Sequence, residues 1–136
     1  MMRVVFGTDE HTPVTDVIIE TLRRKGCDVS TVADGEQWAD VGRAVGEVVA
    51  EGRADRGVVC CWTGTGVSMA ANKVPGARAA LCTDAETARG ARRWNDANVL
   101  AVGLRLTAPE VAKEMLDAFM TTETDEAEGE QVARLR

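Results

Sequence analysis

Short runs of β-forming residues alternate with segments of helical periodicity along nearly the whole chain, and this alternation constrains the fold more than any other feature. Strands are expected over residues 3–7, 27–32, 57–61, 78–82 and 98–102, and helices over 13–25, 37–52, 67–73, 84–94 and 108–120. The third strand is an unbroken apolar run, which is typical of a strand buried on both faces. Strands that alternate with helices form parallel βαβ units. The sequence therefore predicts an α/β fold, a Rossmann-like three-layer sandwich with a five-stranded parallel sheet.

The length of 136 residues predicts a single domain over residues 1–136. Residues 121–136 follow the last predicted helix and begin with a cluster of acidic side chains. This C-terminal arm has two interpretations, a solvated terminus or a segment that docks on a partner subunit.

Composition limits the partners and the compartment. Sixteen Lys and Arg against 22 Asp and Glu give a net charge of −6, which disfavours nucleic acid and anionic membranes as partners. No apolar stretch is long enough to span a membrane, and the N-terminus does not resemble a secretion signal, so we expect a cytoplasmic protein. The four cysteines form no Cys-x-x-Cys pair and His11 is the single histidine, so we expect no metal and no cofactor.

The most informative loop follows the third predicted strand. Cys61 ends that strand and is followed by Trp62 and the segment Thr63-Gly64-Thr65-Gly66. The glycines allow a sharp turn that presents backbone N–H groups, and the next helix directs its positive end to the same place. A thiol at such a helix end is more often a thiolate, so Cys61 is a candidate base or nucleophile beside an oxyanion pocket. The alternative is an ordinary βα turn with a small buried cysteine.

Two further loops carry polar side chains. Asp9 follows the first predicted strand, and Asn95 and Asp96 lie between the fourth helix and the fifth strand. Each has a simpler interpretation, since Asp and Asn also cap helices and end them. Ligands of doubly wound sheets bind beyond the carboxyl ends of the strands, so we expect Asp9, Cys61 and Asn95 to lie on one rim and to form a site.

These residues resemble the family of type B ribose-5-phosphate isomerases and galactose-6-phosphate isomerases. The resemblance runs from about residue 3 to 119 and rests on several motifs. They are Asp9, Ala54-Asp55-Arg56-Gly57, Cys61-x-Thr63-Gly64-x-Gly66-x-Ser68, residues 70–80, Asn95-Asp96-x-Asn98-Val99-Leu100 and Gly103-x-Arg105. It implies a homodimer or a tetramer of dimers, with each site shared between two subunits.

The same resemblance implies cofactor-free aldose–ketose isomerisation through a cis-enediolate. Cys61 matches the family's cysteine base. Backbone N–H groups of the Thr63–Gly66 loop, together with Asn95, would stabilise the enediolate, and Asp9 would hold substrate hydroxyls. Thr63, Gly64, Thr65 and Gly66 are therefore all expected at the site.

Several positions depart from the family pattern. The family has an Asp-His pair where this chain has Asp9-Glu10, and a carboxylate there would repel a phosphate. His11 lies one position later and is a candidate substitute. The family histidine that opens the sugar ring aligns with Trp94, and a family glycine aligns with Trp62, so both indoles are expected to line the pocket.

The phosphate ligands of the family are also largely replaced. The C-terminal arm reads Gly129-Glu130-Gln131-Val132 where the family carries basic residues, and Leu135 takes the place of a further arginine. Arg105 matches a family phosphate ligand, supplemented by Arg134 or Arg136. Because several charged donors normally bind a phosphate, this pattern argues against ribose 5-phosphate as the substrate.

The basic stretch of Arg89, Arg92 and Arg93 on the fourth predicted helix is expected to form a solvated face, with subunit contact or anion binding as the alternative.

The sequence thus predicts a sugar isomerase of carbohydrate metabolism that acts on an open-chain, unphosphorylated or modified sugar. The alternative is a catalytically inactive binding or partner subunit that retains the fold and the dimer. A dinucleotide-dependent enzyme is disfavoured, because the glycines follow the third strand and no Gly-x-Gly-x-x-Gly occurs.

Overall fold

In the computed structural model, which describes residues 1–135, five strands form one parallel sheet in the order β2-β1-β3-β5-β4. The strands are β1 (Arg3–Thr8), β2 (Asp28–Asp34), β3 (Arg56–Cys61), β4 (Ala79–Leu81) and β5 (Val99–Gly103). The predicted five-stranded parallel sheet is confirmed. The chain places β3 at the centre and brings β5 back between β3 and β4, so β2 and β4 are the edge strands.

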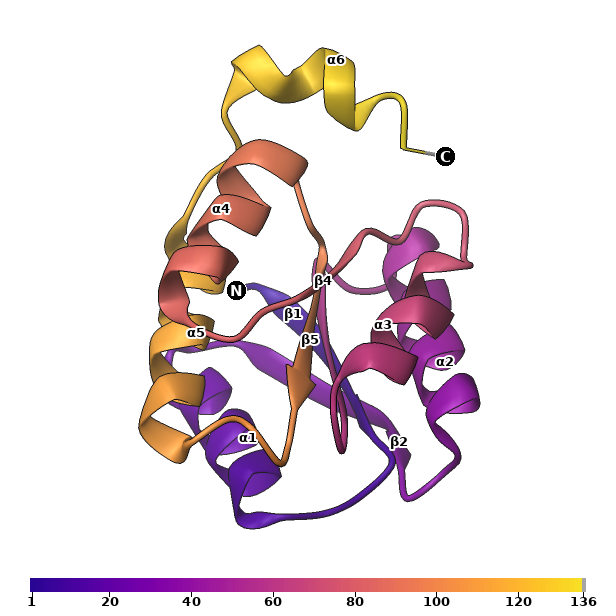
Figure 1. The fold of residues 1–136 in the computed structure, drawn as a ribbon, viewed down its shortest axis with the longest axis vertical. Helices are drawn as coiled ribbons and strands as arrows, with labels where there is room; N and C mark the ends of the chain where they lie inside the picture. Colours follow the sequence, from indigo (N-terminus) through magenta and orange to yellow (C-terminus); the bar gives the residue numbers. More distant parts are fainter. Residues whose placement is uncertain (136) are drawn as a thin grey trace.

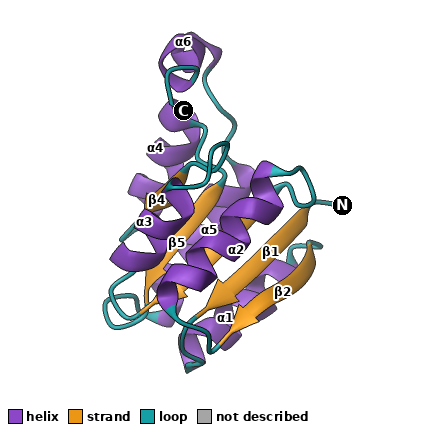
Figure 2. Ribbon diagram, turned by 90° about the vertical axis from the view of Figure 1, so that its right-hand side faces the viewer, coloured by secondary structure: helices purple, strands orange, loops and turns teal. Residues whose placement is uncertain are grey.

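Helices cover both faces of the sheet and complete the three layers (Figures 1 and 2). They are α1 (Pro13–Arg24), α2 (Trp38–Ala50), α3 (Thr65–Asn72), α4 (Ala85–Asn95), α5 (Pro109–Thr121), the short 3-10 turn η1 (Glu126–Glu128) and α6 (Gly129–Val132). One core joins α1, α4 and α5 to the sheet around Phe6, Ile18 and Phe119. The other joins α2 and α3 to the sheet around Val45 and Val59.

Local sequence signals explain where the helices begin. Thr12 caps α1 in a capping box with Thr15, and Pro13 occupies the first helical position. Asp84 caps α4 in the same way, with Thr87 as its partner. The helix α3 begins at residue 65, two residues before the predicted start, because the left-handed turn immediately before it ends the loop early.

The C-terminal arm leaves α5 and runs along α4 before it turns away from the body. The backbone N–H of Asp125 donates to the carbonyl of Arg93 over 2.8 Å, so the first residues of the arm are fixed. Beyond them α6 extends past the end of α4, with little of the domain beneath it (Figure 2). Arg136 lies outside the described residues.

The expectation of a solvated basic face on α4 is wrong at Arg92, which is only 5% exposed. Two of its hydrogen-bond partners, Asp96 and Ala97, end its own helix, but the other two lie in residues 122–124, about thirty positions later, where the local charge pattern could not reveal them. Among residues 1–135, no helix combines the length and the apolar character that a membrane crossing requires.

Candidate functional site

A cavity of about 330 Å³ opens at the carboxyl edge of the sheet, where β1 and β3 end side by side. We call it the Cys61 pocket. It is lined by Asp9, Trp38, Cys61, Trp62, Thr63, Thr65, Gly66 and Met69. The parallel pairing of β1 with β3 brings Asp9 and Cys61 together, as the strand order requires. Four further predicted site residues line the same cavity, namely Trp62, Thr63, Thr65 and Gly66. Gly64 lies between them in the chain, as the N-cap of α3.

Cys61 is the last residue of the central strand and is 5% exposed. Its carbonyl accepts a hydrogen bond from the N–H of Leu104, and the carbonyl of Trp62 accepts one from Arg105, both over 2.9 Å. These bonds continue the β3–β5 pairing beyond the strands and hold the loop after Cys61. The hydrogen bond to Trp62 also places the backbone of Arg105 at this edge of the sheet.

The loop after Cys61 turns into α3 through a left-handed residue. Gly64 has a φ of +79° and is the N-cap of α3, with no side chain that caps the helix. The first N–H groups of a helix have no acceptor within it, and they carry its positive dipole end. The hydroxyls of Thr63 and Thr65 lie 2.8 Å apart across the turn. The start of α3 is therefore suited to bind a negatively charged oxygen.

Asp9 brings an unsatisfied acceptor to the pocket. Among the described residues its Oδ1 is buried and accepts no hydrogen bond. Burial and the charge of Glu10 raise the pKa of the Asp9 carboxyl, although a bond from its own backbone N–H lowers it. A buried acceptor without a partner is costly, so a hydroxyl donated by a ligand would stabilise it.

Trp38 is a pocket residue that sequence reasoning missed. It is the first residue of α2, and its indole lies directly against Gly66, the second residue of α3. A Cβ at Gly66 would come within 2.7 Å of the ring. Trp62 is also present in the lining and is 53% exposed. Two indoles therefore line the cavity, and the sequence motifs indicate only Trp62.

Glu10 and His11 are not in the lining of the Cys61 pocket. The Nε2 of His11 lies 2.8 Å from a carboxylate oxygen of Asp16, and its Nδ1 lies 4.0 Å from Asp34. These contacts engage the imidazole outside the pocket. The backbone carbonyl of Glu10 accepts a hydrogen bond from the Thr8 hydroxyl, which fixes the turn between them.

The expectation that Asn95 lies on the same rim as Cys61 is wrong within one chain. Helices that cross between parallel strands run opposite to them, so the end of α4 reaches the amino edge of the sheet, just before β5. Cys61 pairs with Gly103 at the far end of β5. Trp94 and Asn95 instead line a separate hollow of about 360 Å³ beside β4.

No three His, Cys, Asp or Glu side chains among residues 1–135 come together in a way that could hold a metal ion.

The sheet and its pocket define a Rossmann-like α/β protein with a thiol, a buried carboxylate and a helix N-terminus at the carboxyl edge of its central strands. The family model described as Ribose/Galactose Isomerase matches residues 4–136, and the chain belongs to this family.

Named relatives and solved structures agree with this placement. The chain is 36% identical over 129 residues to ribose-5-phosphate isomerase B of Escherichia coli, covering 88% of this chain and 84% of the relative. It is 35% identical over 129 residues to a D-erythrulose-4-phosphate isomerase of Pectobacterium atrosepticum, covering 90% and 85%. The structure of ribose-5-phosphate isomerase B from Clostridium thermocellum matches with a TM-score of 0.92 and 35% identity, covering 98% of this chain and 94% of that one.

Proposed function

We propose that the protein is a cofactor-free aldose–ketose isomerase that acts through a cis-enediolate. One observation carries the proposal: Cys61, Asp9 with its buried acceptor oxygen, and the first residues of α3 line one cavity. An enediolate mechanism needs a base, a site that stabilises a negatively charged oxygen and an acceptor that binds substrate hydroxyls. Cys61, the start of α3 and Asp9 would supply these in turn. The names of the relatives describe isomerases of phosphorylated sugars, which supports the same reaction class.

In this mechanism the Cys61 thiolate removes the proton from the carbon beside the carbonyl. The electron pair of that C–H bond forms the double bond of the enediolate, and the carbonyl oxygen becomes negatively charged. Backbone N–H groups at the Thr63–Gly66 loop stabilise that oxygen. The Cys61 thiol then returns the proton to the neighbouring carbon, and the hydroxyl proton moves between the two oxygens. Asp9 accepts a hydrogen bond from a substrate hydroxyl throughout.

We propose a substrate other than ribose 5-phosphate. The lining of the Cys61 pocket contains two indoles and a methionine but no Lys or Arg. Glu10 follows Asp9 directly and adds negative charge near the mouth. An open-chain, unphosphorylated or modified sugar fits these walls better than a dianion, because flat indole surfaces pack against apolar faces and carry no positive charge.

A second copy of the chain would complete the site. Asn95 and Trp94 lie away from Cys61 in their own chain, and Trp94 is 54% exposed. Leu81 on the edge strand and Met69 on α3 are exposed as well, which favours an apolar subunit contact on this side. We propose a homodimer, alone or paired into a tetramer, in which Asn95 of one subunit approaches Cys61 of the other.

Isotope exchange tests the reaction directly. The purified protein is incubated in D2O with ribose 5-phosphate, erythrulose 4-phosphate, galactose 6-phosphate and the corresponding free sugars. Proton NMR then follows deuterium at the carbon beside the carbonyl. We expect exchange with at least one sugar, lost in Cys61→Ala and kept in Cys27→Ala, whose thiol lies outside the pocket. Folded protein that exchanges none of these sugars would favour the inactive partner subunit instead.

A further inference from the structure

The turn between α4 and β5 is built around one carboxylate. Asp96 has a φ of 48°, and among residues 1–135 no other residue besides glycines has a positive φ. Asp is one of the few L residues that adopts this left-handed conformation at moderate cost. It follows Asn95 directly, so the conformation of Asp96 sets the direction in which the chain leaves Asn95.

Arg92 connects this turn to the C-terminal arm. Its Nη1 donates to Asp96 Oδ1 over 2.8 Å and to the carbonyl of Ala97 over 2.7 Å. Its Nε and Nη2 donate to the carbonyl of Thr122 and the hydroxyl of Thr124, each over 3.3 Å. The Thr124 hydroxyl in turn donates to Asp96 Oδ1 over 2.9 Å. The first residues of the arm are thus held by the same carboxylate as the turn.

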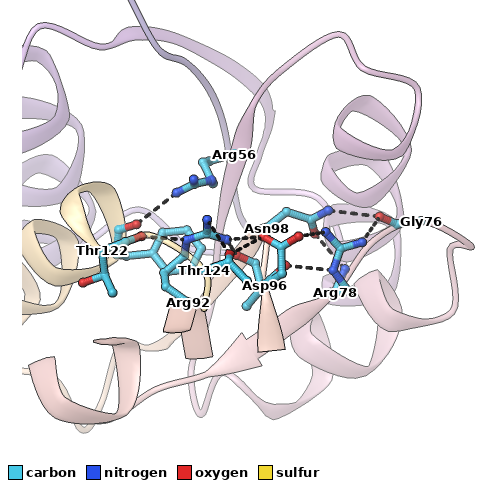
Figure 3. Close-up of polar contacts among 10 residues, drawn as sticks. Arg56, Gly76, Arg78, Arg92, Asp96, Asn98, Thr122 and Thr124 are labelled. Carbon is cyan, nitrogen blue, oxygen red and sulfur yellow. Dashed lines mark hydrogen bonds and ion pairs between the residues drawn. The ribbon is translucent and has the colours of Figure 1, made fainter. Parts of the chain in front are cut away.

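Arg78 connects a third segment, the loop before β4, to Asp96. Its Nη2 lies 3.2 Å from Asp96 Oδ2, and its Nε donates to the Asp96 carbonyl over 2.8 Å. Asn98 accepts from the Arg78 backbone N–H over 2.7 Å and donates to the carbonyl of Gly76 over 3.0 Å (Figure 3). Both carboxylate oxygens of Asp96 are therefore engaged, each by a different arginine.

Burying a guanidinium is expensive for folding, and apolar residues of similar volume often stabilise a core at least as well. The Arg92 network therefore does more than fill space. It joins three segments that are distant in the sequence: the end of α4, the loop before β4 and the first residues of the arm. All three are joined at Asp96, the residue next to Asn95. A charged network of this kind gives a defined geometry, since each hydrogen bond restricts both distance and angle.

We infer that Asp96 is a positioning residue: through Arg92, Arg78 and Thr124 it fixes Asn95 and the C-terminal arm in the orientation that the active site of a neighbouring subunit requires. This inference rests on the proposed enediolate chemistry and shared site, and it adds a residue that touches no substrate. The inference also assigns a function to residues 122–124 of the arm, whose contacts with Arg92 and Asp96 set the direction of the residues that follow.

Two substitutions separate the side chain of Asp96 from its backbone conformation. Asp96→Asn and Asp96→Gly both tolerate a positive φ, but Asn removes the charge and Gly removes the side chain. With the sugar of fastest Cys61-dependent exchange as the probe, we expect kcat to fall about tenfold for Asn and about a hundredfold for Gly, since one oxyanion donor contributes on the order of 10²–10³. Arg89→Gln, on the same helix and paired with the exposed Glu86, should leave kcat unchanged.

Mixed dimers distinguish action on the neighbouring subunit from general damage. A Cys61→Ala subunit and an Asp96→Gly subunit, coexpressed with different tags and purified as the mixed dimer, contain one site with both residues intact. We expect such dimers to recover about half of the wild-type rate, although each variant alone is nearly inactive. If Asp96 acted only within its own chain, no site would be intact, and the absence of recovery would overturn the inference. Failure of any mixed dimer to form would do the same.

Amide hydrogen exchange gives a readout that does not depend on turnover. In Asp96→Gly we expect exchange to speed up at least tenfold in peptides covering residues 94–98 and 122–125, with β3 unchanged. Unchanged exchange in both peptides would overturn the inference even if activity fell. If the wild-type protein isomerised none of the sugars, the proposed function would be wrong. The amide exchange of the Asp96→Gly variant would still decide whether Asp96 fixes these two segments.

Discussion

The indole of Trp38 lies so close to Gly66 that a Cβ on the glycine would come within 2.7 Å of ring atom Cε3 and 2.8 Å of Cδ2. Trp38 begins α2, whereas Gly66 lies in the first turn of α3. The contact therefore joins the two helices at the mouth of the Cys61 pocket. It also sets one wall of that pocket, because both residues line it.

Gly66→Ala should change function more than stability. Alanine stabilises a helical position by about 0.5–1 kcal/mol relative to glycine, and this gain offsets part of the clash with the half-exposed indole. We expect unfolding free energy to change by less than about 1 kcal/mol, measured in urea. The indole must move, however, and a displaced pocket wall should reduce kcat/KM by roughly ten- to a hundredfold. Gly52→Ala, where a Cβ meets open space outside the pocket lining, should leave kcat/KM unchanged. Unchanged near-ultraviolet circular dichroism and kcat/KM in Gly66→Ala would contradict the argument.

Gly64→Ala should destabilise the fold strongly. The residue has a φ of +79°, and a Cβ there would lie 2.8 Å from the backbone nitrogen of Gly103 and 2.6 Å from Leu81. A left-handed L residue costs roughly 1–2 kcal/mol, and overpacking adds roughly 1–3 kcal/mol. Gly26→Ala is the matched control, since Gly26 has a φ of +85° but open space around it. We expect a loss of roughly 1–2 kcal/mol at Gly26 and a clearly larger one at Gly64 in urea unfolding. Equal losses would show that the clash at Gly64 is relieved without cost.

The strands and helices of this fold are predictable from the sequence because the signals that define them are local. Apolar runs, caps such as Thr12, and glycines after helices placed every strand and every helix of the sandwich near its observed position. The pairing of β1 with β3 also made the meeting of Asp9 and Cys61 predictable, since both residues end parallel strands.

The errors have a common physical origin in contacts between distant segments. Asn95 was expected beside Cys61, but the end of a crossover helix lies at the opposite edge of the sheet from the end of a strand. Arg92 resembles a surface residue in the sequence because the arm residues that cover it, Thr122 and Thr124, lie about thirty positions away. Trp38 lines the pocket only because α2 packs against α3, and no motif in its own neighbourhood indicates that.

Asp9→Asn should raise stability and lower activity together. Burial and the charge of Glu10 raise the pKa of Asp9, so the carboxylate is disfavoured in the folded protein and costs stability above that pKa. The neutral amide removes this cost, and we expect a higher Tm at pH 7. The gain should shrink as the pH falls through the pKa, because the wild-type carboxyl then becomes neutral too. Loss of a charged acceptor for a substrate hydroxyl should reduce kcat/KM by roughly ten- to a hundredfold.

The control for Asp9 is Asp40→Asn, an exposed carboxylate that pairs with Arg43 on the surface of α2. It should leave Tm nearly unchanged at every pH, because surface pairs contribute little. A Tm of Asp9→Asn below that of the wild type at pH 7 would contradict the assignment of Asp9 as a buried acceptor without a partner.

Acid should weaken the fold through the Asp96 network. Burial alone would raise the pKa of Asp96, but hydrogen bonds from Arg92 and Thr124 and the charges of Arg78 and Arg92 outweigh it, so the pKa lies below its ordinary value. A lowered pKa means that the stabilising contribution is complete above the unfolded value of about 3.9 and is lost as the pH falls through the folded pKa.

Comparison with Asp96→Asn isolates this contribution, because Asp55 and Asp84 also have lowered pKa values and weaken both proteins alike in acid. At pH 6–7 we expect Asn to cost about 1–2 kcal/mol, the lower part of the range for charged hydrogen bonds, since the Asp96 side chain is 36% exposed and solvent screens its charge. The difference in unfolding free energy between the two proteins, measured in urea, should stay constant from pH 7 to 5 and narrow below about pH 4. A difference that is the same at pH 3 as at pH 7 would mean that the charge of Asp96 contributes nothing, and that the shape of the turn alone holds the arm.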